Sequence, residues 1–156
     1  MQITARDATE ADLADIERLY LRFAAEQAAL RPLWHESEGL PKPVEEAIAA
    51  LVATDAVTVG TIDDLLVGFL VGAEHTLVDG EQRIGIIRYL FTEPAARGVG
   101  LADEMFKHGI AKLAESGIEA FDATVSPGHR EAKNFYEAHG FSARSITMHS
   151  DEPVTD

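Results

Sequence analysis

The sequence of 156 residues contains no cysteine. This absence excludes disulfide bonds, thiolate metal sites and a covalent intermediate on a cysteine sulfur. A long apolar run is missing too, since no segment approaches the roughly 20 apolar residues that a membrane-spanning helix needs. Residues 1–7 lack the apolar stretch of a signal peptide. We therefore expect a cytoplasmic protein that does not associate with membranes.

Basic residues are scarce: 13 Lys and Arg stand against 27 Asp and Glu, which gives a formal net charge of -14. Such a charge repels a nucleic-acid backbone or an anionic membrane at long range, so neither is expected as a partner. A cationic partner is attracted by the same charge. The alternative explanation is that the acidic residues only keep the surface solvated.

The length and the hydrophobic content of 46% fit one compact domain, which we place at residues 1–149, followed by a loosely ordered tail at 150–156. Alternation and β-branched residues predict strands at 2–6, 56–62, 65–76, 83–92, 118–125 and 141–148. Helical spacing predicts helices from the Thr9 cap towards residue 30, at 44–53, at 101–117 and between 126 and 140. Residues 31–43 are predicted to form an irregular connection. These elements predict an α/β fold with a mixed sheet covered by helices on both faces.

The segment 92–102 joins the end of a predicted strand to a glycine-rich turn and the start of an amphipathic helix. Gly98 and Gly100 allow close backbone approach, and the first turn of the helix presents unpaired N–H groups at the positive end of its dipole. A phosphate group fits such a turn. Asp103 stands where a dinucleotide-binding fingerprint needs its third glycine, and no Gly-Lys-Ser/Thr of a nucleotide-triphosphate loop follows.

Two segments together resemble a known family. Residues 97–102, Arg-Gly-Val-Gly-Leu-Ala, are similar to the Arg/Gln-x-x-Gly-x-Gly/Ala signature of the GNAT acetyltransferase superfamily. Residues 132–141 resemble its Ala-x-x-Phe-Tyr-Glu-x-x-Gly-Phe element, in the expected order and with a helix and a strand between them. The resemblance implies the GNAT fold, with a central, mostly antiparallel mixed sheet flanked by about four helices. It also implies an N-acetyltransferase that moves an acetyl group from acetyl-CoA to a primary amine by direct attack in a ternary complex.

The resemblance assigns roles to individual positions. It implies that the backbone of residues 97–102 holds the pyrophosphate of acetyl-CoA and that residues 90–92 hydrogen-bond its pantetheine arm. Tyr136 matches the family's general acid, whereas the alternative is an ordinary core aromatic. His129 stands where the family commonly has Asn. The implied cofactor-binding residues are Leu90, Phe91, Thr92, Arg97, Gly98, Val99, Gly100, Leu101, Ala102, His129 and Asn134.

The acceptor side is less defined. The sequence predicts that the acceptor is a small-molecule or peptide amine, which the negative net charge of the protein suggests is cationic, but it does not identify this amine. No metal is expected, because no pair of histidines stands at i and i+4 with a supporting acid. Candidates for acceptor contact or for the general base are Trp34, His35, Glu36, Glu38, Glu74, His75 and Arg88. The family often forms homodimers, and the sequence leaves this state open. A non-catalytic acetyl-CoA-binding or sensing module is the alternative function.

Overall fold

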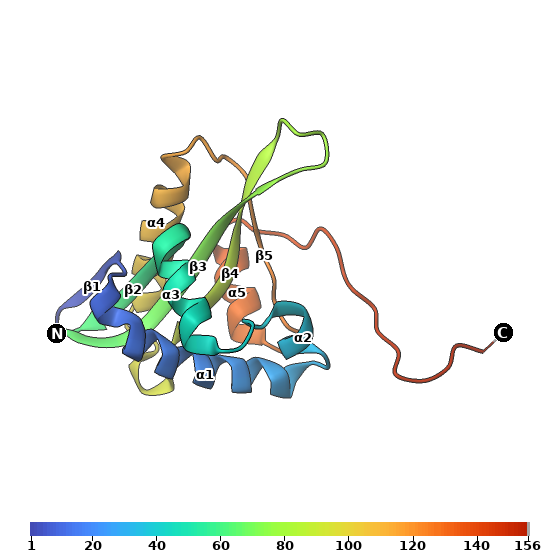
Figure 1. The fold of residues 1–156 in the computed structure, drawn as a ribbon, viewed down its shortest axis with the longest axis horizontal. Helices are drawn as coiled ribbons and strands as arrows, with labels where there is room; N and C mark the ends of the chain where they lie inside the picture. The colour runs from blue at the N-terminus through green and yellow to red at the C-terminus, as the bar shows by residue number, and fades with distance from the viewer. Residues whose placement is uncertain (156) are drawn as a thin grey trace.

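The computed structural model describes residues 1–155, which form one β-sheet with helices on both faces (Figure 1). In chain order the elements are β1 Ile3–Asp7, η1 Glu10–Asp12, α1 Leu13–Leu30, α2 Trp34–Glu38, α3 Val44–Thr54, β2 Ala56–Ile62, β3 Leu65–Thr76, β4 Arg83–Thr92, η2 Pro94–Ala96, α4 Leu101–Ala114, β5 Phe121–Ala123 and α5 Arg130–Ala138. Among the described residues, no helix is long and apolar enough to cross a membrane.

The sheet has the strand order β1-β2-β3-β4-β5 within residues 1–155. The first three neighbouring pairs are antiparallel, and β4 and β5 are parallel. The predicted mixed, mostly antiparallel sheet is therefore confirmed. The described part of the chain has five α-helices where about four were expected, because the short helix α2 lies in the segment 31–43 that was predicted to be irregular.

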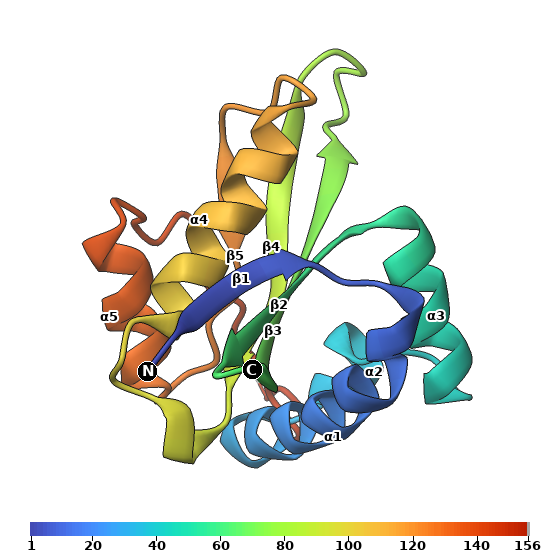
Figure 2. The ribbon, with the colours of Figure 1, turned by 90° about the vertical axis from the view of Figure 1, so that its left-hand side faces the viewer.

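The sheet separates two hydrophobic cores. Helices α1, α2 and α3 bury one of them, which includes Leu19, Phe23 and Trp34, against β2, β3 and β4. Helices α4 and α5 bury the other, around Met105 and Tyr136, on the opposite face. Figure 2 shows the two helical layers on either side of the twisted sheet. The apolar residues at helical spacing in α1 and α4 thus form one face of each helix, and this face packs against the sheet.

Strand β4 departs from regular geometry at one residue. Its register with β3 runs from Val71↔Tyr89 to Gly72↔Ile87, so Arg88 is an extra residue on β4. On its other side β4 pairs with β5 only from Gly85 to Ile87. From Arg88 to Thr92 that side of β4 therefore has no neighbouring strand in the described chain.

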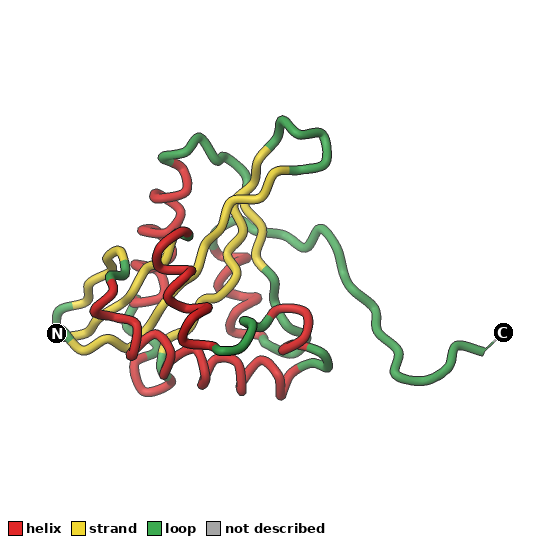
Figure 3. Tube along the Cα trace, in the orientation of Figure 1, coloured by secondary structure: helices red, strands yellow, loops and turns green. Residues whose placement is uncertain are grey.

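Two predicted strands differ from the structure. The strand expected at 118–125 is reduced to Phe121–Ala123, and the one expected at 141–148 does not form within the described residues. Residues 142–155 are exposed and follow an extended path away from the sheet, drawn as loop in Figure 3. Alternation of side chains predicts the capacity to form a strand, but a strand also needs a partner for its backbone N–H and C=O groups. Position 156, the end of the predicted tail, lies outside the described residues.

The start of α1 is tied to β1 by one carboxylate. Asp12 is 6% exposed and accepts hydrogen bonds from both terminal nitrogens of Arg6, at 2.7 and 3.0 Å, and from the Thr9 backbone N–H at 2.8 Å. Thr9 caps the start of the helical segment, as predicted, and forms a capping box with Asp12. The Arg6 hydrogen bonds hold the pKa of Asp12 below its ordinary value.

We expect Asp12→Ala to lower the free energy of unfolding by about 1–3 kcal/mol at neutral pH, because it leaves the Arg6 guanidinium and the Thr9 N–H without their acceptor. Urea denaturation measures this loss. Asp15→Ala is the matched control, since Asp15 is half-exposed and lies 3.4 Å from Arg18, and it should change stability by less than about 0.5 kcal/mol.

The Asp12 contribution depends on pH with a defined sign. A lowered pKa in the folded state means that the stabilisation is present above the ordinary carboxyl pKa of about 4 and is lost as the pH falls through the lowered value. The difference between wild type and Asp12→Ala should therefore shrink in acid. A difference that stayed constant down to strongly acidic pH would contradict this role for the carboxylate.

Candidate active site

The turn between β4 and α4 presents backbone donors. Gly98 and Gly100 have φ angles of +86° and +91°, which only glycine adopts without strain. Gly100 is the N-cap of α4, and the N–H groups of residues 100–103 donate no hydrogen bond within the described chain. Four unpaired amides at the positive end of a helix dipole form a binding site for an anion.

A cavity of about 330 Å³ opens beside this turn, between the end of β4 and helices α4 and α5. Ten of the positions predicted from the sequence line it: Leu90, Phe91, Thr92, Arg97, Gly98, Gly100, Leu101, Ala102, His129 and Tyr136. Two assigned positions do not, Val99 and Asn134, and Asn134 is exposed on α5. The structure thus brings residues from two separate stretches of the sequence, 90–102 and 129–136, to one cavity.

Several lining residues were not assigned from the sequence. Glu26 reaches the cavity from α1, Asp103 from α4 and Glu131 from α5. Ala96, Ala132 and Phe135 complete the lining. Glu26 belongs to no motif. The only indication in the sequence that it could contribute to the site is its spacing of four residues from Arg22, which is itself four residues from Arg18, so that the three lie on one face of the helix. Which element that face contacts is decided by the tertiary fold.

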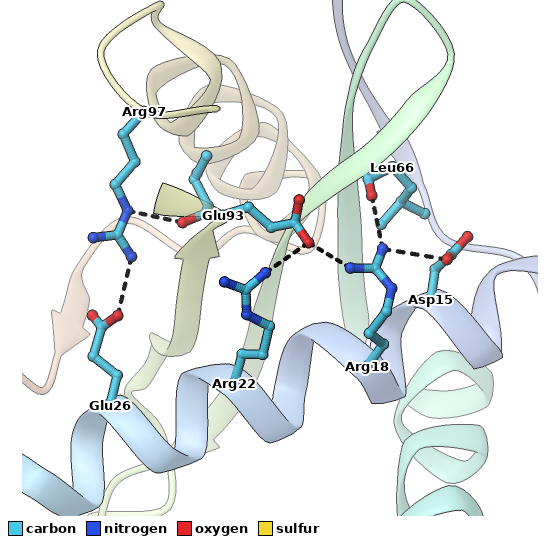
Figure 4. A network of polar contacts seen from close by, with 8 residues as sticks. Asp15, Arg18, Arg22, Glu26, Leu66, Glu93 and Arg97 are labelled. Atoms are coloured by element: carbon cyan, nitrogen blue, oxygen red, sulfur yellow. Dashed lines mark hydrogen bonds and ion pairs between the residues drawn. The ribbon is translucent and has the colours of Figure 1, made fainter. Parts of the chain in front are cut away.

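Arg97 is held in place by groups from three elements. Its Nε donates to the Thr92 carbonyl oxygen at 2.8 Å, and its terminal nitrogens lie 3.2 Å from Glu26 and 3.7 Å from Glu131. Its guanidinium also lies 5.5 Å from the centre of the Phe91 ring. Figure 4 shows Arg97 directed from the turn towards α1. The charge of Arg97 is therefore already compensated by carboxylates.

The same face of α1 is anchored to the end of β4. Arg18 and Arg22 both donate to the Glu93 carboxylate, at 2.5 and 3.1 Å, and Arg18 also donates to the Leu66 carbonyl oxygen at 3.2 Å (Figure 4). Glu93 is largely buried, with 19% of its side chain exposed. Together with the Arg97–Glu26 pair, these contacts fix the position of the turn relative to α1.

Tyr136 is 7% exposed and packs among Phe106, Phe135 and Phe141. Burial raises the pKa of Tyr136 above its ordinary value. No hydrogen bond to its hydroxyl is formed within residues 1–155. The side chain is thus packed as a core aromatic and also lines the cavity.

His129 belongs to a polar network that defines its tautomer. Ser126 Oγ donates to Gln27 Oε1 at 2.7 Å, so the Gln27 amide nitrogen faces His129 Nδ1 at 3.3 Å and donates to it. The ring proton is then on Nε2, which lies 3.7 Å from Glu26. In this tautomer, assigned from the hydrogen-bond network, His129 presents an N–H donor at the cavity.

None of the residues predicted for the acceptor side or for the base lines this cavity. Trp34 is 4% exposed and packs against Phe23 and Tyr89, so it covers the core. Glu38 pairs with Arg31 at 3.2 Å, and Glu74 pairs with Arg83 at 2.9 Å far along β3. The other four positions are His35, Glu36, His75 and Arg88.

Arg88, the extra residue of β4, is half-buried. Its guanidinium lies 5.1 Å from the centre of the Tyr89 ring and donates to the Tyr89 hydroxyl at 3.3 Å. His35, Glu36 and His75 are exposed. Within residues 1–155, no three His, Asp or Glu side chains come together as metal ligands.

Comparison with known proteins identifies the family. The sequence model of the family described as "Acetyltransferase (GNAT) family" matches residues 12–141, which is most of the chain. No curated protein matches the sequence.

Solved structures share the fold over nearly the whole chain. The tetramutant of the BH1408 protein from Bacillus halodurans has a TM-score of 0.79 at 21% identity, with 96% of this chain and 99% of that chain covered. AAC(6')-Iy in complex with the bisubstrate analog CoA-S-monomethyl-acetylneamine has a TM-score of 0.74 at 16% identity, covering 99% and 100%. A structure described as a "predicted acetyltransferase with acetyl-CoA" from Clostridium acetobutylicum has a TM-score of 0.73 at 16% identity, covering 96% of each chain.

We expect Gly100→Ala to cost about 1–2 kcal/mol of stability, because a Cβ disfavours a left-handed backbone. A Cβ there meets no atom within 4 Å, so the cost comes from the backbone alone. Gly80→Ala is a matched control, since Gly80 has φ +75° and equally free surroundings in the distant β3–β4 turn. Denaturant unfolding should give similar losses for both variants. A neutral effect of Gly100→Ala would contradict the observed turn geometry.

Proposed function

Because the chain belongs to the GNAT acetyltransferase family, we propose that it transfers an acetyl group from acetyl-CoA to a primary amine, by direct attack in a ternary complex. One observation carries the proposal: unpaired amides of the turn, the partner-free side of β4 and the Tyr136 side chain meet at one cavity. These are the parts that are needed to hold a phosphate, to align an extended thioester arm and to protonate a leaving thiolate.

The pyrophosphate of acetyl-CoA would lie at the N-terminus of α4. The amides of residues 100–103 supply donors without positive charge. The Arg97 guanidinium could bind the pyrophosphate only if phosphate oxygens replaced the carboxylates of Glu26 and Glu131 as its partners. Backbone amides, rather than cationic side chains, are therefore proposed as the main phosphate ligands.

The pantetheine arm would lie along the side of β4 that faces no strand. Beyond Ile87 this side has backbone groups available to an extended ligand, which binds there as an added strand would. Leu90 and Phe91 line the cavity at this point. Thr92 Oγ1 is buried and has no hydrogen-bond partner within the described residues, so it is one further polar atom that a ligand would satisfy.

His129 is proposed to replace the usual Asn of the family as a donor. The network through Gln27 and Ser126 places the ring proton on Nε2. An imidazole N–H at that position can donate to a carbonyl oxygen of the pantetheine arm, as an Asn amide does. Its role would be to bind the ligand, since Nδ1 is already used as an acceptor.

Tyr136 is proposed as the general acid. After amine attack the thioester carbon loses a thiolate, which must receive a proton. The pKa of Tyr136 is raised by burial, so the phenol keeps its proton at neutral pH. The same apolar surroundings raise the pKa of the leaving thiol, which favours its protonation.

The proposed acceptor is an amine that is cationic before it reacts. The net charge of -14 attracts it, and attack requires that it lose a proton, because an alkylammonium has a pKa near 10.4. One structural neighbour was solved with an analog that joins CoA to acetylneamine, which supports an amine acceptor of this class. No residue is assigned as the base.

Calorimetric titration with acetyl-CoA tests the first part of the proposal. We expect wild type and Gly80→Ala to bind with similar affinity and Gly100→Ala to bind at least about tenfold more weakly, because a Cβ at residue 100 disturbs the amides that meet the pyrophosphate. Pantetheine, which lacks the phosphates, should bind weakly to all three. If no form bound acetyl-CoA, the proposed function would be rejected.

Turnover with a panel of amines tests the second part. The chain has no cysteine, so a thiol reagent measures released CoA without a signal from the protein. We expect Tyr136→Phe to lower kcat by about 10²- to 10⁴-fold while the affinity for acetyl-CoA stays unchanged. Phe141→Leu, which alters the packing beside Tyr136 without removing a hydroxyl, is the control. Unchanged turnover in Tyr136→Phe would remove this residue from the mechanism.

The pH dependence provides an independent check. The raised pKa keeps Tyr136 protonated up to at least its ordinary pKa of about 10. We therefore expect kcat/KM to rise with pH as the amine loses its proton, without a descending limb below about pH 10. Binding of acetyl-CoA with no turnover on any amine would favour the sensing module instead.

A further inference from the structure

One partly buried cation of this chain has no acid beside it. The Lys and Arg side chains of residues 1–155 form ion pairs with the abundant carboxylates, and the exceptions are Lys42, Arg88 and Arg130. Lys42 and Arg130 are exposed to water, whereas Arg88 is half-buried. Partial burial of a charge without a counter-charge costs free energy. A ligand that supplied a carboxylate to Arg88 would remove this cost.

The Arg88 guanidinium keeps most of its hydrogen-bonding capacity free. A guanidinium is planar and carries five N–H donors. Within the described chain, the Arg88 side chain makes one hydrogen bond, to the Tyr89 hydroxyl at 3.3 Å, and its central carbon lies 5.1 Å from the centre of the same ring. The ring thus supports the guanidinium and leaves its other donors for a partner. A carboxylate is the group whose two oxygens match such a fork of donors.

Arg88 lies where β4 loses its neighbour. It is the extra residue of this strand and directly follows Ile87, the last residue that pairs with β5. In the proposed function the phosphates lie at the N-terminus of α4, and the pantetheine arm follows the free side of β4 from Thr92 towards Arg88. The thioester is at the end of this arm that is remote from the phosphates. Arg88 therefore stands at the end of β4 towards which the reacting group is directed.

The Arg88 guanidinium lies on the side of the sheet opposite to α4 and α5. Tyr89 belongs to the core that α1, α2 and α3 cover, and its hydroxyl donates to the Glu38 carbonyl oxygen on α2. The guanidinium that donates to this hydroxyl is therefore close to the end of α2. Figure 2 shows α2 across the sheet from α4 and α5. A second substrate that approached from the α2 side would meet Arg88 without entering the cavity beside α4 and α5.

The end of α2 is locally positive although the protein as a whole is strongly acidic. The Glu38 carboxylate lies 3.2 Å from Arg31, so its charge is already compensated. Arg31 Nε is buried and has no hydrogen-bond partner within residues 1–155. Arg31 and Arg88 thus bring two positive charges to a place where Glu38 supplies one negative charge, and Glu36, the other acid of α2, is exposed to water. A small anionic group is favoured here.

We propose that Arg88 determines the acceptor, because its guanidinium binds the carboxylate of a free amino acid whose amine receives the acetyl group. This inference rests on the proposed acetyl transfer and narrows its acceptor to small zwitterions. The net charge of -14 attracts the ammonium group, and Arg88 binds the carboxylate that the rest of the surface would repel. A zwitterion carries no net charge, so it is not repelled at long range.

The transfer balances with the groups already assigned. The ammonium first loses a proton to water, and the amine nitrogen then forms a bond to the acetyl carbon. The carbon–sulfur bond breaks, and the sulfur takes a proton from Tyr136. The nitrogen loses its second proton, which water carries back to the tyrosine. Arg88 takes no part in these steps, because its role is to hold the acceptor in position.

Turnover with matched sets of amines tests the recognition of the carboxylate. Each set contains one standard L-amino acid, its amide, in which a carboxamide replaces the carboxylate, and the amine that lacks this carbon altogether. We expect kcat/KM of the wild type for at least one amino acid to exceed the values for its amide and its amine by at least about tenfold, because only the carboxylate accepts a charged pair of hydrogen bonds. Turnover of the amide and the amine that equalled or exceeded that of the amino acid in every set would overturn the proposal.

Substitution of Arg88 assigns the preference to this residue. We expect Arg88→Ala to raise KM for the preferred amino acid by about 10- to 100-fold and to change turnover of the matching amide by less than about twofold. Arg88→Lys should have an intermediate effect, since it keeps the charge but not the planar fork. Lys42→Ala is the matched control, because Lys42 is an exposed cation that also lacks an acidic partner in the described chain. Equal losses for the amino acid and its amide in Arg88→Ala would show a merely structural role and contradict the assignment.

Calorimetric titration in the presence of CoA measures acceptor binding without chemistry. We expect the preferred amino acid to bind the wild type at least about tenfold more tightly than it binds Arg88→Ala, whereas its amide should bind both weakly. Affinity for acetyl-CoA should be the same in both proteins, which shows that the variant is folded.

The outcomes separate this inference from the function on which it rests. A protein that acetylates simple amines and accepts no amino acid would overturn the role of Arg88 and leave the acetyl transfer standing. A protein that binds no acetyl-CoA would reject the proposed function itself, and this inference with it.

Discussion

The separation of β4 from β5 is the constraint on which the candidate site depends. The two strands pair only from Gly85 to Ile87, and the extra residue Arg88 changes the register of β4 directly afterwards. A bulge bends its strand and increases the local twist. The second half of β4 therefore leaves its neighbour while it still pairs with β3, and the cavity opens along the side that has become free.

A strand without a neighbour on one side has to be held by other contacts. Here α1 supplies these contacts, because Arg18 and Arg22 form ion pairs with Glu93, and Glu26 forms an ion pair with Arg97. These pairs join the helix to the residues that immediately follow β4. They are partly buried rather than fully exposed, so they are screened less than ordinary surface ion pairs. The helix that covers one face of the sheet thereby fixes the position of the turn between β4 and α4.

The sequence predicted the parts of the site that are local in the chain. The glycines of the turn, the helix behind it and the Phe135-Tyr136 segment are each recognisable from neighbouring residues. Glu26 and Glu131 were missed because their meeting with Arg97 depends on the packing of α1 and α5 around the turn, which no local pattern encodes. Asp103 was missed as a lining residue of the cavity because its neighbour across the cavity, α5, is far away in the sequence. The strand expected at 141–148 was wrong for a related reason: alternation describes the faces of a strand, whereas its formation depends on backbone pairing with another strand, which residues 142–155 do not make.

The acidic composition also limits how this chain can hold a phosphate group. With a net charge of -14 and carboxylates from Glu26 and Glu131 beside Arg97, cationic side chains contribute little free positive charge at the cavity. Backbone amides at a helix N-terminus avoid this difficulty, since their dipoles attract an anion without carrying a net charge that neighbouring acids would neutralise. In the proposed function the turn would bind a polyanion, while the rest of the surface keeps the negative field that would attract a cationic amine. Both substrates of an acetyl transfer to an amine could approach the same acidic protein because one is held by dipoles and the other is attracted by charge.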